Sequence, residues 1–174
     1  MKINAKTQLN TFPAKMPGFI NVTVVGLLAG LSFSVQLALV PMLNHLDAAG
    51  YITTMQGIFP TFMHAVVPLM GIGLGTFLVR LLWLRSPCRG AQYWTLASFG
   101  FFLAGAGITL GGHLPLNNQL THWQPQNPPP DWEQLREHWG RLNFWRFAVA
   151  QLAFLTLLVP FVFGRNRQTE PGVN

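Results

Sequence analysis

Four long apolar runs separated by polar stretches are the feature that most constrains how this chain folds. They cover residues 19–43, 59–84, 93–110 and 144–163. Each run is close to the roughly 20 residues that a helix needs to cross a bilayer. The runs lack the alternation of apolar and polar residues that marks the strands of a membrane barrel. Because backbone polar groups in lipid must be paired within their own segment, these runs are predicted to be membrane-spanning helices.

The composition also favours a membrane protein. Half of the residues are hydrophobic and 9% are charged, whereas soluble domains carry about 25% charged residues. So few charges cannot cover a globular surface. We therefore predict an all-α, polytopic membrane four-helix bundle over residues 18–164, in which a long outer connection, 111–143, joins the third and fourth helices. Residues 1–17 and 165–174 are predicted to be cytoplasmic tails.

Lysine and arginine residues indicate the orientation of the bundle. The first tail carries three lysines and the last carries two arginines, while Arg85 and Arg89 lie between the second and third runs. By the positive-inside rule, both termini and this turn are predicted to face the cytoplasm, as expected in a bacterial inner membrane. The basic residues form no stripe, so the expected partner is the lipid bilayer and not a nucleic acid. The oligomeric state does not follow from the sequence.

The outer connection is the most polar part of the chain next to the apolar runs. It opens with the block HLPLNNQL at residues 113–120 and then becomes rich in proline. Asp131, with a glutamine three residues later, has the form of a capping box. A helix is therefore predicted to begin at Trp132 and to continue into the fourth run. Glu137 and Arg141 are predicted to pair along this helix.

Four residues of that helix share one face because they are three, four and three positions apart, namely Arg136, Trp139, Asn143 and Arg146. Arg146 enters the apolar region, where a charge is costly unless it reaches the interface or meets a partner. Two interpretations follow. Arg146 reaches a lipid phosphate, or Arg146 and Asn143 turn inward and meet Asn117 and Asn118 in a polar pocket.

All five histidines are predicted to lie toward the outer end of the bundle: His45, His64, His113, His122 and His138. Three imidazoles from three helix ends could bind a transition metal or shuttle protons, or they could only hydrogen-bond to headgroups and loops. No His-x-x-x-His or Glu-x-x-His pattern lies on a run, and Cys88 is the single cysteine. No metal site is therefore predicted.

Several blocks of the sequence resemble a known family. They are GLLAGLSFSVQLALVP at 26–41, the Met55-Gln56 pair, the 113–120 block and the ending Trp139-x-x-x-Asn143-x-x-Arg146. These are similar to the anthrone-oxygenase-like membrane proteins, whose bacterial members mostly carry a domain of unknown function. The resemblance extends over residues 22–160. It implies a small four-helix membrane protein, and some fungal members oxygenate an anthrone, a tricyclic aromatic ketone, to the anthraquinone.

The resemblance suggests a chemistry for the polar residues. An anthrone can lose a proton from its methylene carbon, and the resulting anion can pass an electron to O₂, so no cofactor is expected. Such a site needs a base and donors for the developing oxyanion. We expect His64 or His113 as the base and Arg146 as a catalytic cation. The residues expected to bind substrate are Asn117, Asn118, Trp139 and Asn143.

The expected function is thus the binding or oxygenation of a small apolar aromatic molecule in a pocket at the non-cytoplasmic end. The alternative is a non-catalytic membrane accessory or small-molecule-binding protein, which the lack of a dense acid/base or metal motif favours. A transporter or channel is disfavoured, because the sequence shows no inverted repeat and no charged residue near the middle of the bilayer.

Overall fold

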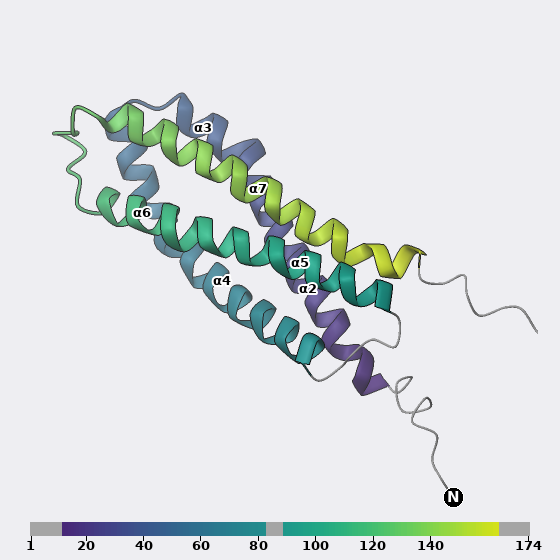
Figure 1. Ribbon diagram of the computed structural model, residues 1–174. Coiled ribbons are helices and arrows are strands. Elements are labelled where there is room, and N and C mark those ends of the chain that lie inside the picture. Colours follow the sequence, from purple (N-terminus) through teal and green to yellow (C-terminus); the bar gives the residue numbers. More distant parts are fainter. Residues whose placement is uncertain (1–11, 83–88, 164–174) are drawn as a thin grey trace, which may run out of the picture.

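The computed structural model describes residues 12–82 and 89–163, which form an elongated bundle of helices (Figure 1). The helical segments are α2 (Phe12–Ser34), η1 (Val35–Leu39), α3 (Val40–Asn44), α4 (Ala48–Leu82), α5 (Arg89–Ile108), η2 (Thr109–His113), α6 (Leu114–Leu120) and α7 (Trp132–Phe163). The described residues contain no strand, only one isolated bridge between Gln124 and Asn127. The predicted all-α four-helix architecture is confirmed.

These segments make four continuous rods, because η1 and α3 extend α2, and η2 and α6 extend α5. All four are long and apolar enough to cross a membrane, with candidate spans of 29 to 35 residues. At 1.5 Å per residue the rods measure about 45–50 Å, and the hydrocarbon core is only about 30 Å thick. The helices therefore extend well beyond the apolar runs that the sequence shows.

The helix ends differ from the boundaries of the apolar runs. The second rod begins at Ala48, eleven positions before the second run, and the third continues to Leu120. As predicted, a helix begins at Trp132 and continues without a break into the fourth run. The predicted outer connection, 111–143, is therefore largely helical, and only residues 121–131 form a loop between α6 and α7.

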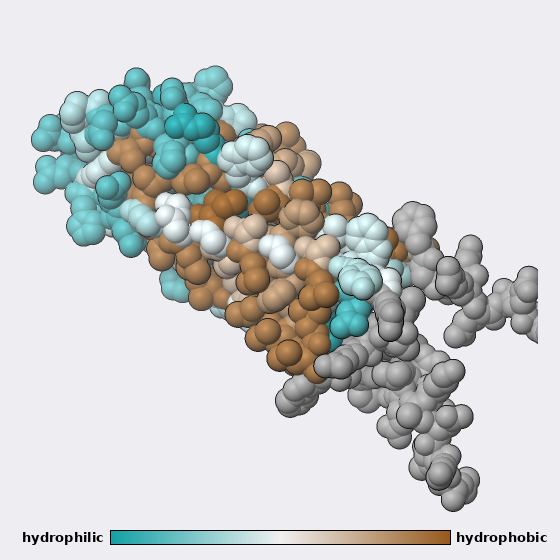
Figure 2. Space-filling view, viewed as in Figure 1, coloured by the Kyte–Doolittle hydropathy of each residue, from teal (hydrophilic) through white to brown (hydrophobic). Residues whose placement is uncertain are grey.

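The two ends of the bundle have different compositions. Figure 1 shows α2 beginning and α7 ending at the same end, here called the tail end (residues 16–21, 76–82, 89–95 and 157–163). The opposite loop end holds residues 44–52 and 113–139. Figure 2 shows a broad hydrophobic surface between the hydrophilic loop end and a smaller hydrophilic area at the tail end. Such a belt is typical of a lipid-facing surface, and with the four long apolar helices it indicates an integral membrane protein.

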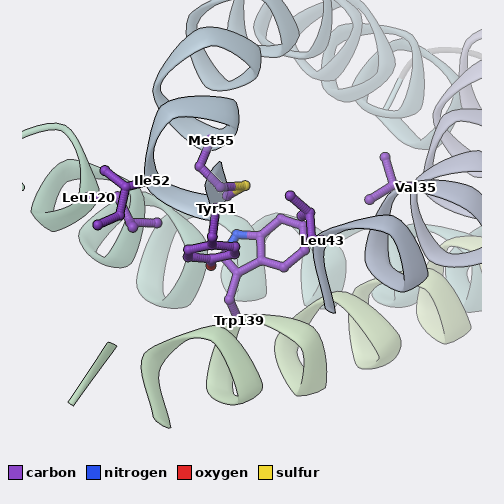
Figure 3. Close-up of a cluster of buried hydrophobic side chains, with 7 residues drawn as sticks. All are labelled: Val35, Leu43, Tyr51, Ile52, Met55, Leu120 and Trp139. Atoms are coloured by element: carbon purple, nitrogen blue, oxygen red, sulfur yellow. The ribbon is translucent and has the colours of Figure 1, made fainter. Parts of the chain in front are cut away.

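Two clusters of buried side chains hold the rods together. α7 packs against α5 and α2, and α2 also packs against α4. The cluster toward the tail end comprises Val25, Phe77, Phe102, Ala153 and Leu157. The cluster at the loop end comprises Val35, Leu43, Tyr51, Ile52, Met55, Leu120 and Trp139 (Figure 3). The ring centroids of Phe77 and Phe102 are 5.3 Å apart. This aromatic contact determines which sides of α4 and α5 face each other.

Two of the rods contain a five-residue π-helical segment, and each segment is followed by a proline two residues later. These prolines are Pro41 after η1 and Pro115 after η2. Proline has no N–H to donate and its ring crowds the preceding turn, so a wider turn accommodates it. Pro60 and Pro68 lie within α4, which stays α-helical, so proline alone does not produce this segment. Both π segments contact α7, and π turns are frequent at functional sites.

The Met55-Gln56 pair links α4 to the loop end. The Gln56 side-chain nitrogen donates to the backbone carbonyls of Leu120 and Trp123, both at 2.9 Å. These bonds tie α4 to the last residue of α6 and to the loop that follows it. Met55 is buried in the adjacent cluster. The pair that the resemblance singled out therefore supports the structure of the loop end.

Candidate functional site

Asn143 and Arg146 on α7 turn toward the interior of the bundle and meet Gln36 on η1. The Asn143 Nδ2 donates to the Gln36 Oε1 at 2.8 Å, and its Oδ1 accepts a hydrogen bond from Arg146 Nη2 at 2.5 Å. Asn143 has no exposed surface. The Arg146 Nε is buried and has no hydrogen-bond partner in the described part of the chain. Of the two interpretations of Arg146, the structure favours the inward one, with Gln36 as the partner of Asn143 in place of Asn117 and Asn118.

A second polar group surrounds Trp139. The Trp139 indole N–H donates to the Asn117 Oδ1 at 3.1 Å, and the His113 ring stands edge-on to the indole with centroids 5.5 Å apart. All three side chains are buried. Both ring nitrogens of His113 lack a hydrogen-bond partner among the described residues, as does the Tyr51 hydroxyl. Figure 3 shows Tyr51 beside Trp139.

Two of the predicted site residues lie apart from these groups. Asn118 is exposed, because it follows the buried Asn117 and points to the other side of α6. His64 is also exposed, and it lies near the middle of α4 because that helix begins at Ala48. The structure therefore brings His113, Asn117, Trp139, Asn143 and Arg146 toward the interior of the bundle, but not His64 or Asn118.

The histidines do not gather at one point. His45, His122 and His138 are exposed, as His64 is, and only His113 is buried. Within residues 12–82 and 89–163, no three His, Cys, Asp or Glu side chains are placed so that they could hold a metal ion.

A partly open cavity lies between the two hydrophobic clusters, with a volume of about 80 Å³. All four rods line it, mostly with aliphatic, aromatic and methionine side chains. Arg146 is the only charged residue of the lining, and the hydroxyl residues Ser32 and Thr109 also contribute. His113, Asn117 and Trp139 do not line this cavity, so it lies deeper in the bundle than the pocket that we expected at the loop end.

Gln36 is the site residue that the sequence analysis missed. It is one of two amides in the first apolar run, the other being Asn21, and its position between Val35 and Leu37 was a usable signal. Its partner could not be assigned, because the π turn of η1 changes which residues face α7.

The chain was compared with known proteins. A family model described as Anthrone oxygenase matches residues 55–156, more than half of the 174-residue chain. No curated protein and no solved structure matches the chain. The matched segment runs from the second turn of α4 into α7, so it contains His113, Asn117, Asn143 and Arg146 but not Gln36. The chain therefore belongs to the anthrone oxygenase family.

Proposed function

We propose that the cavity binds a flat, largely apolar molecule through one acidic or carbonyl oxygen held by Arg146, and that the bound molecule is oxygenated there. One observation carries this proposal: the buried Nε of Arg146 has no partner and belongs to the only charged residue that lines an apolar cavity. An arginine stays charged even where burial is costly. A negative oxygen would therefore be strongly favoured beside it.

An anthrone has the required shape and polarity. Its three fused rings would lie among the apolar side chains, and its single oxygen would face the guanidinium. Loss of a methylene proton leaves negative charge on that oxygen, which Arg146 stabilises while Asn143 holds the guanidinium in place. O₂ then accepts the electrons; one of its atoms becomes the new carbonyl oxygen, and the other leaves as water with the two methylene hydrogens.

The base in this proposal is His113, which does not line the cavity and therefore acts through one bridging water molecule. It is buried, both of its ring nitrogens are without partners among the described residues, and it follows the cavity-lining Thr109 by one turn of η2. His64 is exposed, which does not support this role. Asn117 supports the site indirectly, because it holds the Trp139 ring against which His113 packs.

The cavity must widen to admit three rings, because an engineered cavity that binds benzene has about 150 Å³ and this one has about 80 Å³. Met63 and Met70 line it, and unbranched thioether side chains rearrange easily. α4 and α5 pack against each other less than α5 packs against α7. The side between α4 and α5 is therefore the proposed entrance for a molecule dissolved in lipid.

Binding without catalysis is the second candidate function. It is favoured by the lining itself, in which no carboxylate or imidazole accompanies Arg146. Binding and oxygen consumption must therefore be measured on the same protein. In detergent or lipid discs, the wild type is expected to consume one O₂ per anthrone, faster than the spontaneous reaction. Binding without O₂ uptake would support the accessory or binding role.

Two arginine variants measured in this assay distinguish damage to the proposed site from the loss of one positive charge elsewhere on the helix. Arg146→Met is expected to lower the rate about 100-fold, the usual effect of removing one oxyanion donor. Arg141→Met is the matched control, because Arg141 lies on the same helix, is exposed and, within the described part of the chain, pairs only with Glu137 at 3.7 Å. Equal rates for Arg146→Met and the wild type would contradict the proposed site.

We further propose that the protein lies in a bacterial inner membrane with both termini in the cytoplasm. The lysines and arginines of residues 1–17 and 165–174, together with Arg85 and Arg89, support this orientation. All four acidic residues of the described ranges lie at the loop end, which then faces away from the cytoplasm.

A further inference from the structure

A third group of polar side chains lies at the tail end of the bundle. The tail-end hydrophobic cluster lies between this group and Arg146. Arg80 on α4 donates from Nη1 to the Asn21 Oδ1 on α2 and from Nη2 to the Thr95 hydroxyl on α5, both at 3.3 Å. Asn21 also donates to the Thr76 hydroxyl at 2.9 Å. Asn21 and Thr95 are buried. One guanidinium therefore joins three of the four rods.

These partners do not neutralise the charge of Arg80. The amide of Asn21 and the hydroxyl of Thr95 are neutral, and a guanidinium stays protonated. The carboxylates of the described residues all belong to the loop end: Asp47, Asp131, Glu133 and Glu137. A guanidinium has five N–H donors in a fixed fork, so its two bonds to neutral oxygens of the described residues leave donors available to an anion.

The aromatic residues next to this polar group favour a position in the headgroup zone of a bilayer. Tyr93 and Trp94, which precede Thr95, are 69% and 43% exposed, and such rings prefer the headgroup zone. Arg80 lies two residues before Leu82, the last described residue of α4. A Cβ added at Gly18 would lie 4.0 Å from the Arg80 Cζ, so this glycine leaves space beside the guanidinium.

We propose that Arg80, positioned by Asn21 and Thr95, binds an anionic phosphate group. Arginine is well suited to this because its planar fork matches two phosphate oxygens. The group can be the phosphodiester of a lipid headgroup or a free phosphate ion, which share this chemistry. The site shares no residue with the lining of the Arg146 cavity. A test of this site is therefore independent of the proposed function.

The experiment measures the thermal unfolding midpoint of delipidated protein in detergent during titration. The additives are phosphatidylglycerol, phosphatidylcholine and inorganic phosphate at constant ionic strength. We expect phosphatidylglycerol to raise the midpoint of the wild type, with an apparent affinity about tenfold weaker in Arg80→Gln. A shift with inorganic phosphate alone would identify free phosphate as the source, and a shift with lipid only would identify the headgroup.

Arg136→Gln is the matched control at the loop end. Arg136 is also partly buried, donates to the Leu46 carbonyl at 3.1 Å and lies 4.6 Å from the Trp132 ring. Its substitution removes the same charge and should leave the lipid response unchanged. Arg80→Lys keeps the charge without the fork, and it tests the site if the glutamine variant does not fold; we expect about threefold weaker binding. The proposal is overturned if no additive raises the unfolding midpoint of the wild type, or if the Arg80 variants respond to the additives as the wild type does. It is also overturned if Arg136→Gln weakens the lipid response as much as Arg80→Gln does.

Discussion

The Asn143 amide on α7 donates a 2.8 Å hydrogen bond to the Gln36 side chain on η1, and through Asn143 this pair holds Arg146 inside the bundle. Gln36→Leu is expected to lower the free energy of unfolding by about 1–3 kcal/mol, because it leaves the buried Asn143 Nδ2 without an acceptor. A double-mutant cycle with Asn143→Leu should give a coupling of about 0.6–1.7 kcal/mol, the usual range in membrane bundles. Strictly additive effects would show that the two side chains do not interact.

Gln151→Leu is the control for that experiment. Gln151 donates to the Ala29 carbonyl at 2.9 Å and also joins α7 to α2, but it has no bond to Arg146. Both glutamine variants should lose stability in detergent unfolding. Only Gln36→Leu should also weaken the binding of an acidic aromatic ligand, because only Gln36 fixes the Asn143–Arg146 pair.

Asn117 and Asn118 are adjacent in the sequence but differ in burial, so they form a matched pair. Asn117→Leu is expected to cost about 1–3 kcal/mol, because the buried Trp139 N–H loses its acceptor at Asn117 Oδ1. Asn118→Leu should change stability by no more than about 0.5 kcal/mol, as most surface substitutions do. Equal losses of unfolding free energy in the two variants would be inconsistent with the observed register of α6.

Gly73 and Gly71 test the packing of α4 against α5. A Cβ at Gly73 would lie 3.0 Å from the Phe102 ring, whose movement is limited by its stacking on Phe77. Gly73→Ala is therefore expected to destabilise the bundle by about 1–3 kcal/mol. Gly71 has open space around it, and its replacement by alanine should be neutral or slightly stabilising, since alanine favours helix. Thermal unfolding that ranked the two variants in the opposite order would place the α4–α5 contact elsewhere.

Cys88 is the only cysteine and allows the proposed orientation to be measured directly. In intact cells it should resist a membrane-impermeant maleimide, and it should be labelled in inside-out vesicles. A Cys88→Ser protein carrying Gln126→Cys should show the reverse, because position 126 lies in the loop between α6 and α7. Labelling of Cys88 from outside the cell would show that the protein has the opposite orientation.

The four rods could be predicted from the sequence because the bilayer imposes both the length and the apolar character of a spanning helix. The start of α4 was not predicted, since residues 48–58 mix polar and apolar positions, whereas the start of α7 was predicted from its capping box. A local signal was nevertheless present at Asp47, whose carboxylate accepts from the Gly50 N–H at 2.9 Å. This is an N-cap geometry, and it marks the start of α4.

Helical spacing predicted that Asn143 and Arg146 share one face of α7, but it left open whether that face turns inward or toward lipid phosphate. Their partner could not be predicted from spacing, since it depends on how η1 turns Gln36 toward α7. The depth of the cavity was missed for a related reason. Its lining comes from single apolar residues on four rods, and nothing in their spacing distinguishes them from ordinary core residues.

The account depends most on Arg146 as the group that holds an acidic oxygen inside an apolar cavity. Titration of the protein with a hydroxylated anthraquinone, whose absorption changes when its phenol ionises, measures this directly. We predict that the wild type and Arg141→Met shift the bound dye toward its ionised spectrum, and that Arg146→Met binds it about tenfold more weakly without the shift. The same spectral shift and affinity in Arg146→Met would contradict the account.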